Sequence, residues 1–120
     1  MPASDTEKEF VTYVVDLMQS IGPVQARFMF GGHGIFLDDL MFGLIADATL
    51  YLKADKETIN EFSDKDLEAF TYVKKGKEYK MSYYQAPEET LEDSEEMITW
   101  ANKAYNAALR AASKQRKDEK

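Results

Sequence analysis

Three glycines lie within four positions of this chain, at Gly31, Gly32 and Gly34, between two runs of bulky apolar residues. Glycine reaches backbone conformations that are closed to other residues, but it loses more conformational entropy on folding, so its surroundings must compensate. Such a cluster is typical of a sharp turn, a bulge or a close approach of two backbone segments. We predict that the flanking residues 26–30 and 34–38 form either two strands or one strand bent at the glycines.

Four more segments have the composition of β-strands. Each is short, rich in aromatic and branched residues, and bounded by turn residues. Hairpin-length turns between successive segments imply an antiparallel sheet. The predicted strands cover residues 40–47, 49–53, 70–73 and 80–84.

Helical periodicity occurs near both ends of the chain. Apolar residues recur at three- and four-residue intervals over residues 4–21 and 93–113, in segments that contain neither glycine nor proline. This pattern predicts two amphipathic helices. Both begin with the spacing of a capping box, at Ser4 and at Asp93. A short helix is expected over residues 56–63.

These elements predict a single α+β domain over residues 1–120, with a charged C-terminal tail from about residue 113. With the first two strand segments counted as one bent strand, the order is α-β-β-β-α-β-β-α. We expect a two-layer arrangement in which helices cover one face of an antiparallel sheet.

Composition narrows the classes of function. The chain has 44% apolar residues and no cysteine, which excludes disulfides and thiol catalysis. No apolar run reaches the ~18 residues of a membrane span, and the polar N-terminus does not resemble a signal peptide, so a cytoplasmic protein without membrane contact is expected. The net charge is −7, and the basic residues gather at 110–120. An acidic body repels phosphate backbones, so direct DNA binding is disfavoured.

The candidate catalytic groups have simpler interpretations. His33 is the only histidine, and we interpret it as an exposed loop residue because a base or metal ligand needs positioned partners. The glycine cluster lacks the Gly-Lys-Ser/Thr ending and the following helix of a phosphate-binding loop. Paired acidic residues lie mainly in turns or at a helix N-terminus. We therefore expect no catalytic set, no metal site and no cofactor.

Two features favour binding over catalysis. Arg27 begins an apolar strand, so its guanidinium is expected to bond a carbonyl or carboxylate or to reach the surface. The seven tyrosines and Trp100 cannot all be buried cheaply, because each carries a polar group that needs a partner. Some are expected to form an exposed aromatic patch for a protein partner, with scattered single aromatics as the alternative.

The segment around the glycine cluster resembles the signature of the TfoX N-terminal domain family, the TfoX/Sxy competence regulators. The resemblance runs in order through most of the chain, in Leu50-Tyr51-Leu52-Lys53-Ala54-Asp55, Phe70-x-Tyr72, Met81-Ser82-Tyr83-Tyr84-x-x-Pro87 and Trp100-Ala101-x-x-Ala104-x-x-Ala107. The residues that we take as signature and candidate interaction residues are Arg27, Met29, Phe30, Gly31, Gly32, Gly34, Tyr83 and Trp100.

The resemblance implies a fold like that of secretion chaperones and a role in transcriptional control of bacterial competence genes. It also implies action together with a cyclic-AMP receptor-type regulator. Full-length regulators of this kind resemble this domain followed by a helical domain, so a chain ending at Lys120 is expected to be a stand-alone N-terminal domain. One departure is Lys65-Asp66, where the family usually has a glycine, which suggests a different turn.

We therefore expect a non-enzymatic protein-interaction module whose partner belongs to the transcription machinery or is a cyclic-AMP receptor-type protein. The alternative is a small-molecule or peptide binding domain with a pocket beside the glycine turn, near Arg27 and Tyr83. An exposed edge strand or aromatic patch could also support a homodimer.

Overall fold

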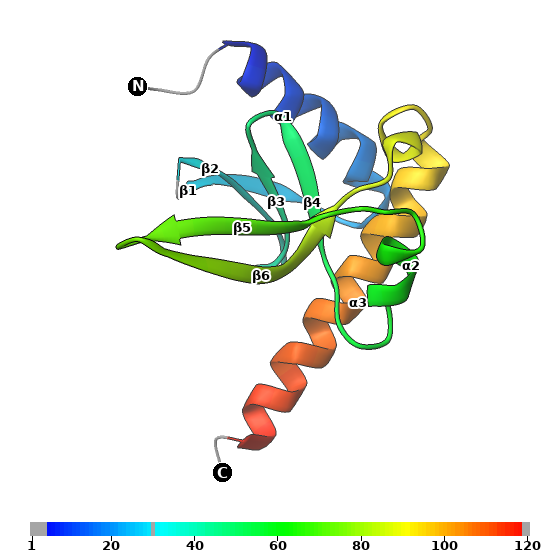
Figure 1. Ribbon diagram of the computed structural model, residues 1–120. Coiled ribbons are helices and arrows are strands. Elements are labelled where there is room, and N and C mark those ends of the chain that lie inside the picture. Colours follow the sequence, from blue (N-terminus) through cyan, green and yellow to red (C-terminus); the bar gives the residue numbers. More distant parts are fainter. Residues whose placement is uncertain (1–4, 30, 119–120) are drawn as a thin grey trace.

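Six strands form one antiparallel sheet in the computed structural model, which describes the backbone of residues 5–29 and 31–118 and the side chains of residues 6–29 and 31–114. The strand order across the sheet is β1-β2-β3-β4-β6-β5 (Figure 1). The strands are β1 (Gln25–Met29), β2 (Gly32–Leu37), β3 (Leu40–Ala46), β4 (Thr49–Lys53), β5 (Ala69–Lys74) and β6 (Lys77–Gln85). The predicted α+β class and antiparallel sheet are confirmed.

The glycine cluster reverses the chain rather than bending one strand. Strands β1 and β2 pair antiparallel, with Met29 opposite Gly32, and Gly31 between them has a φ of 74°. Four strands therefore precede the short internal helix. The predicted order, which counts the first two segments as one bent strand, has three strands before it. The other tight hairpins also turn through positive φ, at Asp38-Asp39, Asp47-Ala48 and Lys75-Gly76. Positive φ at both central residues matches the right-handed twist of the strands.

In the described part of the chain, three helices cover one face of the sheet (Figure 1). Helix α1 (Asp5–Met18) continues into a 3-10 turn at Gln19–Ile21, and α2 is the short helix Ile59–Ser63. Helix α3 (Ser94–Asp118) begins where Asp93 Oδ1 accepts a hydrogen bond from the Glu95 amide at 2.9 Å. The predicted cap of α3 is confirmed, whereas the predicted cap at Ser4 lies outside the described residues.

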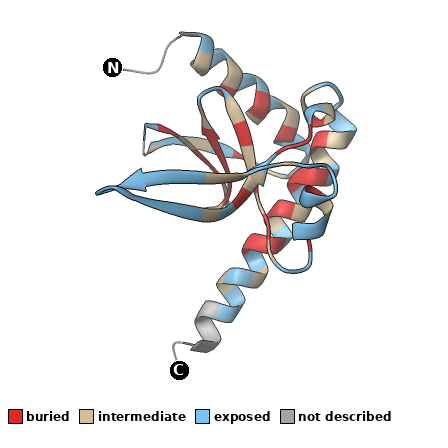
Figure 2. Ribbon diagram, in the orientation of Figure 1, coloured by how far each residue is buried: buried red, intermediate tan, exposed pale blue. Residues whose placement is uncertain are grey.

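The core lies between the helices and the sheet, as the buried segments in Figure 2 show. Small side chains on α3 let this helix lie close to β3 and β4, and Phe62 of α2 is completely buried beside them. Ile59, on the same short helix, is exposed. The core residues include Val14, Met18, Ile35, Phe42, Ile45, Leu50, Leu52, Phe62, Met97, Ala101 and Ala104.

A β-bulge in β3 decides which of its side chains enter this core. The register of β2 and β3 shifts so that Ile35 lies opposite Gly43 and Phe36 opposite Met41, which leaves Phe42 as the extra residue. Phe42 is buried on the helical side, where its ring meets Tyr105 edge-on at 5.6 Å. Met41 is turned to the opposite face as a result.

Asp55 carries a pH-dependent part of the stability. Two guanidinium nitrogens of Arg110 donate to its carboxylate at 2.6 and 3.1 Å, and this hydrogen bonding holds the pKa of Asp55 below its ordinary value. Because the folded-state pKa lies below the unfolded one, the stabilisation is present above about pH 4 and is lost as the pH falls through the folded-state pKa.

We expect Asp55→Asn to cost about 1–2 kcal/mol of unfolding free energy at neutral pH and to weaken the loss of stability in acid. Urea unfolding at several pH values measures both. Glu57→Gln is the control, because Glu57 also contacts Arg110, at 3.1 Å, but is far more exposed. An acid dependence unchanged by Asp55→Asn would contradict the assignment.

Candidate functional site

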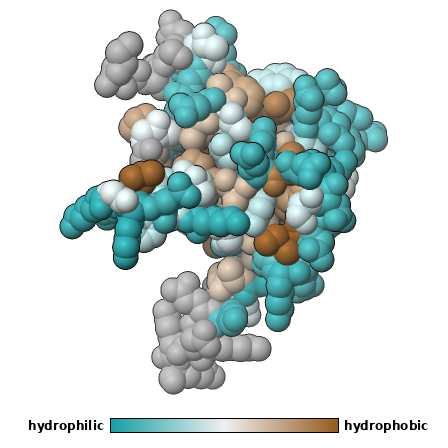
Figure 3. Space-filling model, in the orientation of Figure 1, coloured by the Kyte–Doolittle hydropathy of each residue, from teal (hydrophilic) through white to brown (hydrophobic). Residues whose placement is uncertain are grey.

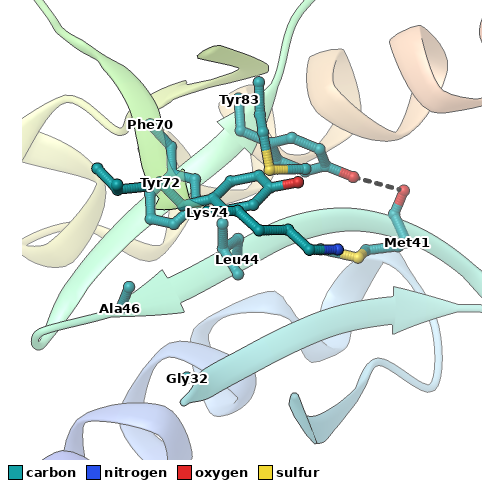
Figure 4. Close-up of a pocket in the computed structure, with 10 residues that line it drawn as sticks. Gly32, Met41, Leu44, Ala46, Phe70, Tyr72, Lys74 and Tyr83 are labelled. Atoms are coloured by element: carbon teal, nitrogen blue, oxygen red, sulfur yellow. Dashed lines mark hydrogen bonds between the residues drawn. The ribbon is translucent and has the colours of Figure 1, made fainter. Parts of the chain in front are cut away.

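An apolar groove lies on the sheet face that the helices leave open (Figure 4). Strands β2 and β3 form its floor, and the β5–β6 hairpin forms its wall. Its volume is about 460 Å³. The residues that line it are Gly32, Met41, Leu44, Ala46, Phe70, Tyr72, Val73, Lys74, Met81 and Tyr83.

The wall exists because the β5–β6 hairpin extends past the rest of the sheet. Only residues 83–85 of β6 pair with β4, whereas the remainder of β6 pairs with β5 alone. The register of the hairpin shifts near Ala69 and Thr71, where a bulge increases twist and bends the strand. Figure 1 shows the hairpin projecting away from the helices. Every residue from 71 to 80 is exposed.

Several of the signature residues lie on the open face. Side chains alternate along a strand, which places Arg27 and Met29 of β1 on the same face as Gly32 and Gly34 of β2. A Cβ added at Gly34 would lie 2.6 Å from Met29 Sδ. Glycine at this position therefore lets the Met29 side chain lie across the strand. Gly32 contributes directly to the groove floor.

Arg27 is held at the edge of the open face. Its guanidinium lies over the Phe36 ring, 4.5 Å from the centroid, and donates to Asp39 Oδ1 at 2.6 Å. Of the alternatives expected for Arg27, the structure shows a bond to a carboxylate on a half-exposed side chain. Arg27 does not line the groove, so the predicted pocket near Arg27 and Tyr83 contains only the second of these residues.

Tyr83 closes the inner end of the groove. Its hydroxyl donates a hydrogen bond to the Met41 carbonyl at 3.4 Å, as Figure 4 shows. Burial raises the pKa of Tyr83 to about 12, so the phenol stays protonated at physiological pH. The ammonium of Lys53 lies 5.3 Å from the Tyr83 ring centroid. These contacts fix the ring as a rigid part of the groove.

The other signature residues lie elsewhere. Trp100 belongs to α3 and packs edge-on against Phe62 at 5.2 Å, within the core on the far side of the sheet. Gly31 is in the β1–β2 turn, where no atom lies within 4 Å of an added Cβ. Phe30 lies outside the described residues. The structure therefore brings Gly32 and Tyr83 together in the groove and keeps Trp100 apart from them.

The predicted location of His33 in an exposed loop is wrong. His33 belongs to β2, not to an exposed loop, and its ring meets Phe28 edge-on at 5.4 Å. Its Nδ1 atom is buried and has no hydrogen-bond partner among the described residues. The chain turns earlier than expected, at Gly31, which places the histidine within the paired strand. Among the described residues, no group of three metal-ligating side chains is arranged to hold an ion.

Sequence reasoning missed most of the groove wall. Phe70, Tyr72 and Lys74 alternate along β5, while Met81 and Tyr83 alternate along β6. This period of two was visible in the sequence and predicts a shared face. What it could not indicate was that the face would lie over β2 and β3.

Arg27→Ala is expected to lower the unfolding free energy by about 1 kcal/mol, because it removes an exposed ion pair and a cation–π contact. Thermal unfolding should show a decrease of a few degrees. Asp39→Asn removes only the ion pair and tolerates the positive φ of 63° at this turn, so its effect should be smaller. An unchanged melting temperature for Arg27→Ala would remove its structural role.

The part of the chain that the structure describes contains no helix long and apolar enough to cross a membrane.

Comparison with known proteins identifies the domain. The family model of the TfoX N-terminal domain matches residues 16–108. The chain is 33% identical over 85 residues to "DNA transformation protein TfoX1" of Aliivibrio fischeri, covering 71% of this chain and 39% of that protein.

A second relative is "Protein Sxy" of Escherichia coli, which is 24% identical over 98 residues, covering 82% of this chain and 47% of that protein. The chain thus spans less than half the length of these two curated relatives. The family match covers most of the residues described above, including the floor and the wall of the groove. The chain therefore belongs to the TfoX N-terminal domain family.

Proposed function

We propose that this chain is a non-enzymatic interaction module that acts in transcriptional regulation of competence genes by binding a protein partner in the cytoplasm. Family membership and the relative named as a DNA transformation protein support the biological setting. The observation that carries the proposal is the apolar groove on the uncovered face of the sheet. The partner class is a component of the transcription machinery or a cyclic-AMP receptor-type regulator.

The surface around the groove suits protein binding. Tyr72, Val73 and Tyr79 on the projecting hairpin are 40%, 68% and 43% exposed. Exposed aromatic and apolar side chains beside a concave surface favour a protein contact, because a partner that covers them removes apolar area from water. The groove needs no rearrangement of the helical layer to be reached, since it opens on the opposite side of the sheet.

A groove-blocking variant tests this proposal in the native cell. Ala46→Arg places a long side chain on the groove floor, whereas Thr71→Arg makes a similar change at an exposed position of the hairpin that does not line the groove. We expect Ala46→Arg to reduce transcripts of DNA-uptake genes as gene deletion does, with Thr71→Arg remaining close to wild type. Wild-type transcript levels in a folded Ala46→Arg strain would contradict the proposal.

A small-molecule ligand is the second candidate, because the groove volume of about 460 Å³ falls within the size range of ligand pockets. Thermal-shift screening with nucleotides, organic acids and peptides separates the two. A small molecule that raises the melting temperature of wild type but not of Ala46→Arg would favour this alternative.

A further inference from the structure

We propose that the groove receives an extended protein segment that alternates apolar and acidic residues, and that lysines of the β5–β6 hairpin bind its carboxylates. This inference rests on the proposed function of the groove as a partner site. It adds the chemistry of the partner segment, which neither the family match nor the relatives' names contain.

Three lysines form a basic cluster at the end of the hairpin, which we call the lysine arm: Lys74, Lys75 and Lys77. Within the described part of the chain, none of the three forms an ion pair. The whole chain carries a net charge of −7, so the arm is a local reversal of sign. Figure 3 shows the hairpin as a hydrophilic projection from the body.

The register of the hairpin places like charges opposite each other. Lys74 pairs directly with Lys77, while Glu78, the one acidic residue of the segment 71–81, pairs with Val73. Like charges directly opposite each other on adjacent strands are destabilising. A carboxylate from outside would relieve this repulsion, and nothing within the hairpin does so. The arrangement therefore favours an anionic ligand over a purely structural role.

The lysine arm is continuous with the apolar groove. Lys74 itself lines the groove, and in Figure 4 its side chain extends along the groove toward Met41. Its stem covers apolar surface while its ammonium reaches the rim. One ligand can therefore place an apolar side chain against Met41 and Leu44 and a neighbouring carboxylate at the lysines.

Strand β5 supplies a backbone surface for an extended segment. It is the terminal strand of the described sheet, so one edge has no strand partner. A peptide that adds to such an edge pairs its backbone and directs alternate side chains to one face. Alternation of apolar and acidic residues would send the first set into the groove and leave the second near the rim.

Nucleic acid also attracts lysines and aromatic rings, but three observations favour a peptide. The chain outside the lysine arm is strongly acidic, which opposes a long phosphate backbone. Tyr72 and Tyr79 stack on each other at 5.4 Å, so each already occupies one face of its partner. The groove floor is aliphatic, with methionine, leucine and alanine rather than stacking surfaces.

Fluorescence anisotropy with defined probes tests the inference. The acidic probe is a labelled peptide that alternates leucine or phenylalanine with glutamate. The basic probe replaces each glutamate by lysine, the neutral probe by glutamine, and the nucleic-acid probe is labelled oligo-dT. We expect the full chain to bind the acidic probe at least about tenfold more tightly than the other peptides, with affinity that falls as salt rises.

The matched variants reverse two charges each. The double variant Lys74→Glu with Lys77→Glu still has like charges opposite each other. The repulsion within the hairpin is therefore preserved while the two charges change from positive to negative. We expect a loss of about tenfold or more in acidic-probe affinity. Lys56→Glu with Lys114→Glu makes the same change of net charge at exposed sites outside the lysine arm and should change affinity by less than about twofold. Circular dichroism verifies that both variants fold.

The outcomes separate this inference from the proposed function. Absence of acidic-probe binding, equal binding of the neutral or basic probe, or tighter binding of oligo-dT would each overturn the acidic-segment assignment. Equal binding of the neutral probe that Ala46→Arg abolishes would still leave the groove as a partner site. Wild-type transcripts in the Ala46→Arg strain would instead overturn the proposed function itself.

Discussion

Gly32→Ala is expected to destabilise the fold by about 3 kcal/mol or more, a value at the upper end for adding a methyl group to a packed structure. A Cβ at this position would lie 2.3 Å from the carbonyl oxygen of Ile45. That oxygen belongs to the backbone of β3, the strand paired with β2, so it cannot rotate away as a side chain would. Relief requires the two strands to separate. Urea unfolding followed by circular dichroism measures the loss.

The two neighbouring glycines provide matched controls. An added Cβ at Gly34 would meet Met29 Sδ and Phe36 Cε1, which are outer atoms of side chains that can move, so Gly34→Ala should cost about 1 kcal/mol. A Cβ added at Gly31 would meet no atom within 4 Å, so only the positive φ of 74° at this residue opposes the substitution. We expect Gly31→Ala to destabilise the fold by about 1 kcal/mol. Equal unfolding free energies for the three variants would contradict the close backbone approach at Gly32.

Trp100→Ala is expected to lower the unfolding free energy by about 3–5 kcal/mol, as for other large aromatic residues removed from a core. The Trp100 side chain is 7% exposed, and its ring packs edge-on against the completely buried Phe62. The cavity left by the indole would face Phe62 and the surrounding alanines of α3. Because Trp100 is the only tryptophan, unfolding is followed by circular dichroism rather than by fluorescence.

Lys103→Ala separates packing from charge at the same place. Lys103 lies over the Trp100 ring at 5.4 Å and pairs with Glu61, but both side chains are partly exposed, so its loss should be below about 1 kcal/mol. Trp100→Phe should recover much of the stability lost in the alanine variant. A Trp100→Ala protein that unfolds like wild type would show that the residue is retained for a contact outside the core.

Local signals predicted the elements because they reside in neighbouring residues. The three- and four-residue recurrence of apolar residues predicted the buried side of α3 as Met97, Ala101, Ala104, Tyr105, Ala108 and Ala112. Four of these are buried, whereas Tyr105 and Ala112 are only partly buried. Asp93 predicted the start of the same helix from its capping pattern. Turn residues predicted the hairpins. Helix α3 continues to Asp118, beyond the predicted end near residue 113, because no glycine or proline stops it.

The groove could not be predicted in the same way, because it depends on contacts between distant segments. The bulge at Phe42 shifts the faces of β3, so a strict alternation counted back from the buried Ile45 places Met41 on the core side and gives the wrong floor. The position of the hairpin over β2 depends on how few residues of β6 pair with β4. Neither feature has a signature within a short window of sequence.

The short attachment of the hairpin has a consequence for how the groove responds to an occupant. Strand β6 is registered against β4 only at Tyr83, Tyr84 and Gln85, and the exposed residues 71–80 contribute nothing to the buried core. Local opening of such a segment requires less free energy than global unfolding. The β5–β6 hairpin can therefore move relative to the rest of the sheet. The width of the groove can adapt to side chains of different size while the helical layer stays intact.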